Sequence, residues 1–210
     1  MKAITKYLMF LFFLLAMISC KKDFLNKAPD DDLTIADVFS NRDYANNYLT
    51  NVYSHLPDEM VWADNKDNPF HGAADELKQF YPPSFCNSMT SGAWDANSTV
   101  INPWARNYTG LRKANIFIEN IDKVPLDQYY TKEARDRQKG EAIFLRAFYH
   151  FLLVRLYGAV PIADSSISLD ANFAAIRRQP LEKCVAFIVS QCDLAASMLP
   201  PRIKSETEYG

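Results

Sequence analysis

The sequence predicts an all-α fold of antiparallel helical pairs, interrupted by one long irregular loop. Apolar residues recur at the helical spacing of three and four residues in several segments. Residues that start and stop helices bound these segments, such as Asn102-Pro103 before one of them and Gly158 after another. The connections between successive helices also include short ones, which favour antiparallel neighbours.

The first predicted helix follows a charged leader. Thr34 and Ser40 are each followed three residues later by Asp, a spacing typical of successive helix N-caps. We expect this helix to end near Leu56-Pro57. Its apolar stripe consists of Ala45, Tyr48, Leu49, Val52, Tyr53 and Leu56.

Residues 57–102 have a different composition. Prolines, glycines and many Asn, Asp and Ser residues occur here, and no helical or alternating period is sustained. A connection of this length inside a domain is unusual and is often functional. We therefore expect an irregular insertion loop.

Three further helices are expected after this loop, at 103–122, 131–157 and 180–199. The second half of 131–157 is apolar almost all round, which predicts burial on most sides. Helices 103–122 and 131–157 form one tetratricopeptide-like pair, and 180–199 is the first half of a second pair. Its predicted stripe is Leu181, Val185, Ile188, Cys192, Ala195 and Leu199.

The N-terminus predicts secretion and lipid anchoring. A basic start and an apolar run of 12 residues lead to Ser19-Cys20, whereas a membrane span needs roughly 20 residues. A cysteine at the cleavage point is similar to a bacterial lipobox. We expect residues 1–19 to be a signal peptide and Cys20 to carry acyl chains such as palmitate. Residues 20–33 then form an acidic leader, and residues 34–210 the helical domain.

Composition excludes several function classes. Acidic residues outnumber basic ones, 25 to 23, which argues against a nucleic-acid partner. The three histidines do not have ligand spacing, and the sequence contains no nucleophile elbow, phosphate loop or dinucleotide fingerprint. We expect no metal, no cofactor and no enzymatic activity. Apart from Cys20, the cysteines are expected to be buried free thiols, because Cys184 and Cys192 lie about 12 Å apart along one helix.

Two polar residues lie within the apolar helix 131–157. His150 is interpreted as a hydrogen-bonded structural histidine. Arg146 must be paired to be tolerated on an apolar face, with Glu119 and Glu141 as the candidate partners.

The long loop supplies candidate ligand-binding residues. Its aromatic side chains stand among amides and acids, a combination that suits sugars, whose CH faces stack on rings while their hydroxyls need polar partners. Each ring has the alternative role of fixing the loop to the helices. Trp94 has the strongest claim, because Gly92 and Ala93 leave its face open. The candidates are Trp94, Trp62, Tyr81, Asp95 and Asn97.

Several segments resemble the SusD/RagB family of outer-membrane lipoproteins. The resemblance begins at Cys20–Asp23, includes His71–Glu76 and Arg112–Asn115, and is most specific in Gly140–Tyr149 and Val154–Pro161. It covers the whole chain, although family members are more than twice as long. It implies an N-terminal domain that is incomplete at its C-terminus.

The resemblance implies a cell-surface function without catalysis. Such proteins bind a glycan or another nutrient and form a lid over a TonB-dependent, SusC-like transporter. The chain is therefore expected to be anchored in the outer membrane, facing the exterior, and to capture oligosaccharide. The alternative is an interaction module that docks on the transporter without binding ligand. A surface hydrolase is a third, less favoured hypothesis.

Overall fold

A computed structural model describes residues 33–57, 72–75, 85–97, 99–168 and 170–201. The chain divides after Thr34 into two units, and the unit from Ile35 onward holds the helices described here. No strand occurs in these ranges, which confirms the all-α prediction. The elements are α2 (Ile35–Val38), α3 (Arg42–Tyr53), α4 (Phe85–Thr90), α5 (Trp104–Asn120), the 3-10 turn η2 (Ile121–Lys123), α6 (Lys132–Tyr157), η3 (Phe173–Ala175) and α7 (Leu181–Met198).

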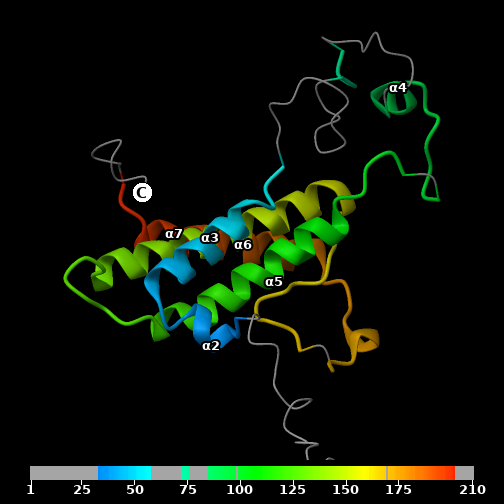
Figure 1. The fold of residues 1–210 in the computed structure, drawn as a ribbon. Helices are drawn as coiled ribbons and strands as arrows, with labels where there is room; N and C mark the ends of the chain where they lie inside the picture. Colours follow the sequence, from blue (N-terminus) through cyan, green and yellow to red (C-terminus); the bar gives the residue numbers. More distant parts are fainter. Residues whose placement is uncertain (1–32, 58–71, 76–84, 98, 169, 202–210) are drawn as a thin grey trace, which may run out of the picture. The chain divides into compact units, whose positions relative to one another are not determined.

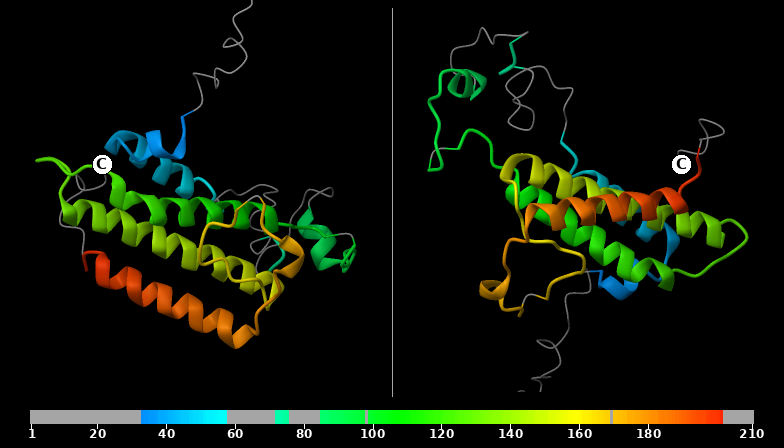
Figure 2. Two further views of the ribbon diagram at one scale, coloured as in Figure 1. Left: turned by 90° about the horizontal axis from the view of Figure 1, so that it is seen from below. Right: turned by 180° about the vertical axis from the view of Figure 1, so that it is seen from behind.

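The long helix α6 is the centre of the helical body (Figure 1). It packs along α5 on one side and along α7 on the other, and α3 lies across α5 and α6 (Figure 2). The predicted pairing of α5 with α6 and the placement of α7 as the next helix are therefore correct. The buried core lies where α3, α5 and α6 meet, and its largest fully buried side chains are Tyr149, Phe39, Phe117, Leu111, Ile121, Leu145 and Leu153.

Local chemistry explains where α5 and α6 begin and end. α5 begins one residue later than the Asn-Pro start predicts, because Pro103 is its N-cap and Trp104 its first residue. The backbone N–H of Trp104 donates to Asn102 Oδ1 at 3.4 Å. Thr131 caps α6 by accepting from the N–H of Ala134 at 3.3 Å. Gly158 ends α6 with φ of 67°, a left-handed conformation that favours glycine.

The N-terminal cap prediction was partly wrong. α2 begins directly after Thr34, but Asn41, not Ser40, caps α3. Asn41 Oδ1 accepts from the N–H of Asp43 at 2.7 Å, while the hydroxyl of Ser40 donates back to the Asp37 carbonyl and closes α2. Asn is as good a cap as Ser, so sequence spacing alone did not separate the two. The described part of the insertion loop also contains a short helix, α4, that was not predicted.

The second half of α6 is buried on most sides, as predicted. One side is open, because α3, α5 and α7 do not cover it, and Phe144 and Phe151 on that side are each 44% exposed. The stripe predicted for α7 was partly wrong. Ala195 is buried and Ile188 and Cys192 are half-buried, as predicted, but Leu181 and Val185 are exposed and Cys184 is buried instead. α7 is apolar on more than one side, so its periodicity identified the side that meets α6 only in its second half.

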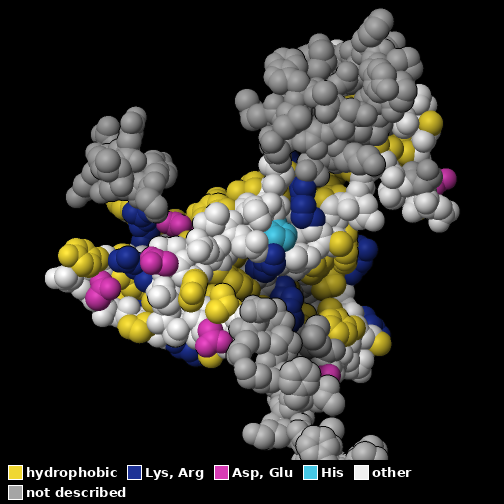
Figure 3. Space-filling view, in the orientation of Figure 1, with side chains coloured by type: hydrophobic (Ala, Val, Ile, Leu, Met, Phe, Trp, Pro, Cys, Tyr) yellow, Lys and Arg dark blue, Asp and Glu magenta, His cyan; other side chains and the backbone are white. Residues whose placement is uncertain are grey.

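Charged side chains are interspersed where α6 begins (Figure 3). The carboxylate of Asp122 contacts both Lys139 and Arg135, and Lys132 pairs with Asp136 one turn along α6. Exposed pairs of this kind contribute little to stability. Within the described ranges, no helix is both long enough and apolar enough to cross a bilayer.

Candidate functional site

A pocket lies between the end of α6 and the loop that follows α4. Its volume is about 250 Å³, near the lower end of ligand pockets, which span roughly 300–1,000 Å³. It therefore has room for a small part of an oligosaccharide. The described residues that line it are Met89, Trp94, Asp95, Ala96, Thr99, Val100, Ile101, Leu156 and Tyr157.

The turn after α4 places Trp94 at the pocket. Gly92 has φ of 73°, and the N–H of Ala93 donates to the Ser88 carbonyl at 2.9 Å, so the helix stops and the chain reverses. Trp94 follows directly and is 49% exposed. A half-exposed indole beside an open volume can stack on a ligand ring.

Asp95 is held by a local turn. Its Oδ1 accepts the backbone N–H of Asn97 at 2.7 Å. This bond orients the carboxylate, whose residue lines the pocket. The side chain of Asn97 is not among the lining groups, so Asn97 contributes through its backbone.

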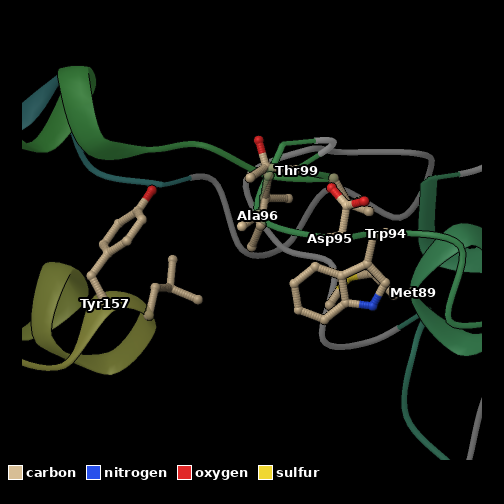
Figure 4. A pocket seen from close by; sticks show the side chains of 9 residues that line it. Met89, Trp94, Asp95, Ala96, Thr99 and Tyr157 are labelled. Atoms are coloured by element: carbon tan, nitrogen blue, oxygen red, sulfur yellow. The ribbon is translucent and has the colours of Figure 1, made fainter.

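Tyr157 forms the opposite end of the pocket. Figure 4 shows Tyr157 on the last turn of α6 at one end and Trp94, Asp95 and Met89 at the other, with Ala96 and Thr99 between them. The Tyr157 hydroxyl donates to Asn102 Oδ1 at 3.0 Å. Burial raises the pKa of Tyr157 above its usual value.

A second layer of contacts fixes Tyr157. Its ring meets the ring of Trp104 edge to face, with centroids 5.0 Å apart. The Arg178 guanidinium lies 5.5 Å from the Trp104 centroid and donates to the carbonyls of Ala159, at 2.9 Å, and Tyr157, at 3.3 Å. These contacts hold the α6 end of the pocket in place, and Trp104 itself packs against the hydrophobic core.

The buried polar residues of α6 form a separate structural cluster. Arg146 donates to Asn115 Oδ1 at 3.0 Å, to the Asp164 carbonyl at 2.8 Å, and to Gln191 Oε1. The predicted partners Glu119 and Glu141 were wrong, because Glu119 binds Ser166 and Glu141 binds Tyr53 and Arg137. Neutral acceptors on α5, α7 and the loop after Pro161 therefore bind the two terminal nitrogens of Arg146, whereas its buried Nε has no hydrogen-bond partner among the described residues.

His150 is structural, as predicted. Its Nε2 accepts the N–H of Ala163 at 3.1 Å, so Nδ1 carries the proton that it donates to the Arg146 carbonyl at 2.8 Å. Burial lowers the pKa of His150 to about 4, and the charge of Arg146 adds to this effect. A neutral ring with both nitrogens occupied is not available for acid–base chemistry.

The cysteines, the possible metal ligands and the other predicted site residues have different outcomes. Cys86 and Cys184 are buried and do not form disulfides, as predicted, and Cys192, which also forms none, is half-buried. Among the described residues, no three His, Cys, Asp or Glu side chains are grouped as metal ligands. The candidates Cys20, Trp62 and Tyr81 lie outside the described residues. The structure brings Trp94 and Asp95 together at one pocket.

Sequence reasoning missed Tyr157 and Leu156 as lining residues. Both belong to an apolar helix segment that was interpreted as core. Their position in the sequence could have indicated this role. Both residues lie in the last turn before Gly158, and helix ends next to loops often border pockets.

Comparison with known proteins identifies the family. Residues 23–209 match the SusD-like family that is described as "Starch-binding associating with outer membrane". The chain belongs to the SusD-like family. SusD-like protein P2 of Formosa agariphila is 29% identical over 114 residues, which are 54% of this chain and 21% of P2.

Solved SusD-like structures share the fold. A SusD-like protein from Bacteroides fragilis superposes with a TM-score of 0.70 at 23% identity, over 88% of this chain and 34% of that one. A laminarin-binding SusD-like protein superposes with a TM-score of 0.67 at 20% identity, over 82% and 37%. This SusD-like chain thus spans about a fifth of P2 and about a third of each structure.

Proposed function

We propose that this SusD-like chain is part of a cell-surface lipoprotein that captures oligosaccharide and passes it to a TonB-dependent, SusC-like outer-membrane transporter. The observation that carries the proposal is the pocket, where Trp94, Asp95, Thr99 and Tyr157 lie on an otherwise apolar lining. An aromatic plane with a few polar groups matches the two kinds of surface that a sugar presents. The proposed role is binding without catalysis.

The family supports the choice of ligand. The family description names starch, and one solved relative is named for laminarin binding. Both are glucose polymers without charge. We therefore choose maltohexaose and laminarihexaose as the first ligands to test.

Calorimetric titration of both hexasaccharides tests the binding proposal. Trp94→Ala is expected to raise Kd by about tenfold, because an aromatic contact contributes roughly 1 kcal/mol in addition to its buried area. Phe173→Ala is the matched control, since Phe173 is also about half exposed but does not line the pocket. Saturable binding that Trp94→Ala leaves unchanged would contradict this site.

The proposed anchor and partner have their own tests. Cells expressing the chain are grown with labelled palmitate. The label is expected to appear on the wild-type protein but not on Cys20→Ser, and the labelled protein is expected in the outer membrane. Equal labelling of both proteins would contradict lipid anchoring at Cys20.

Co-purification tests the transporter partnership. The tagged full-length protein is expected to co-purify with a TonB-dependent barrel protein from its own outer membrane. Absence of the barrel protein from that eluate would count against the partnership.

The runner-up function is an interaction module without a ligand. Exposed apolar side chains on α6 and α7, among them Phe144, Phe151 and Val189, are suited to a protein contact. Co-purification with the barrel together with flat titrations of both hexasaccharides would favour this alternative.

A further inference from the structure

We propose that Arg178 is a positioning residue for the pocket: it holds the last turn of α6 and the ring of Tyr157 in the arrangement that binds glycan. Arg178 is not itself among the described residues that line the pocket, so its effect on a ligand comes through Tyr157. The inference rests on the proposed function, because it concerns the affinity of the same pocket for glycan.

Arg178 caps the C-terminal end of α6 from a distant part of the chain. The last carbonyls of a helix have no partner within that helix, and Gly158 turns the chain away after Tyr157. Nη1 of Arg178 donates to the Ala159 carbonyl at 2.9 Å and to the Tyr157 carbonyl at 3.3 Å. A cation at this end of a helix also interacts favourably with the helix dipole. The capped turn carries Leu156 and Tyr157, which both line the pocket.

The same guanidinium contacts the aromatic ring that supports Tyr157. It lies 5.5 Å from the centroid of the Trp104 ring, within the range of a cation–π contact. The Trp104 ring in turn meets the Tyr157 ring edge to face, with centroids 5.0 Å apart and an interplanar angle of 88°. Arg178 therefore acts on Tyr157 in two ways, through its backbone carbonyl and through the ring of Trp104.

The hydroxyl of Tyr157 is held as well. It donates to Asn102 Oδ1 at 3.0 Å, and the same oxygen accepts the backbone N–H of Trp104 at 3.4 Å. Tyr157 is thus fixed at its backbone, at its ring and at its hydroxyl. A side chain that is already ordered loses less conformational freedom when a ligand binds, and this favours affinity.

The neighbouring Arg177 provides a matched control. Both arginines are exposed, so neither substitution leaves an unpaired charge inside the fold. Arg177 also donates to backbone carbonyls, but these belong to its own turn: Ala174, and Ile176 at 3.4 Å. The two residues therefore differ in whether they contact the end of α6.

The first test compares glycan affinities of the wild type, Arg178→Ala and Arg177→Ala. Each protein is titrated calorimetrically with maltohexaose and laminarihexaose, and its thermal unfolding is recorded to show that it is folded. Arg178→Ala is expected to raise Kd about fivefold, because it removes both the cap and the cation–π contact. Arg177→Ala is expected to keep the wild-type Kd.

A double-mutant cycle with Tyr157→Ala separates positioning from a general structural role. Tyr157→Ala alone is expected to raise Kd about tenfold, because an aromatic contact with the ligand is lost. Adding Arg178→Ala is then expected to change Kd by less than about twofold, because the side chain that Arg178 positions is gone. A general loss of stability would weaken binding equally in both backgrounds.

The outcomes distinguish this inference from the proposed function. Glycan binding that Arg178→Ala leaves unchanged overturns the positioning role and leaves the proposed function intact. A fivefold loss that persists in the Tyr157→Ala background also overturns it, since Arg178 would then act without Tyr157. Absence of binding by the folded wild type overturns the proposed function, and the positioning role with it.

Discussion

Gly110 on α5 lies directly against the ring of Tyr149 on α6. A Cβ at position 110 would stand 2.8 Å from the nearest ring carbon, which is closer than a methyl group tolerates. The ring is fully buried and its hydroxyl donates to the Val52 carbonyl on α3. This glycine therefore sets the distance at which α5, α6 and α3 meet.

Gly110→Ala is expected to destabilise the fold by about 2 kcal/mol, despite the better helix propensity of alanine. The ring cannot move away without losing its bond to α3. Urea unfolding measures the effect, and Thr109→Ala, at the exposed neighbouring position, is expected to change stability by less than about 0.5 kcal/mol. A stabilised Gly110→Ala variant would show that the ring yields easily.

His150 makes the stability of the fold depend on pH. Its pKa is about 4 in the folded state, against an ordinary value of 6.5. Between these values the unfolded chain binds more protons, so stability is fully present above pH 6.5 and is lost as the pH falls toward 4. The expected loss between pH 7.5 and pH 4.5 is roughly 2 kcal/mol.

The comparison with His150→Gln isolates this effect, because glutamine does not titrate. Unfolding free energies of both proteins are measured at pH 7.5 and 4.5. The advantage of the wild type is expected to shrink by roughly 2 kcal/mol at the lower pH. Parallel pH profiles for the two proteins would mean that His150 does not take part.

Arg146 joins three parts of the chain: α5, α7 and the loop after Pro161. Arg146→Ala is expected to cost about 3 kcal/mol, because Asn115 and Gln191 each lose a charged donor inside the fold. Thermal unfolding measures the loss. The control is Arg155→Ala on the exposed side of α6, for which a change below about 1 kcal/mol is expected. Similar losses for both arginines would contradict a special role for the buried one.

The exposed apolar residues of α6 and α7 predict self-association. Phe144 and Phe151 are open on α6, and Val185 and Val189 follow one another by one turn on α7. Val189→Glu is expected to shift the purified chain toward monomer in sedimentation velocity, whereas Phe173→Glu, in η3, is expected to leave the distribution unchanged. A wild type that is monomeric at 100 μM or above would refute this prediction.

The sequence predicted what depends on local spacing. The bounds of α6 followed from Thr131, Gly158 and a long apolar pattern, and the pairing of α5 with α6 followed from their short connection. The structural role of His150 also followed, because a lone polar ring in an apolar helix needs partners. Residues that are close to one another in the sequence determine these features.

What the sequence did not predict depends on distant segments. The partners of Arg146 come from residues 18 and 45 positions away as well as from α5, and no periodicity encodes such a contact. The exposed side of the first half of α7 was misassigned because several sides of this helix are apolar. Trp94 and Asp95 were named as site residues from composition, but their neighbour Tyr157 required the three-dimensional arrangement.

The measurement that tests the central claim most directly is the indole N–H spectrum of the 15N-labelled chain during titration with laminarihexaose and maltohexaose. The chain has three tryptophans, so Trp94→Phe assigns the relevant signal by its disappearance. We predict a saturable shift of the Trp94 signal that gives the same Kd as calorimetry. Saturable sugar binding with an unmoved Trp94 signal would contradict the account, because the ligand would then occupy a site other than this pocket.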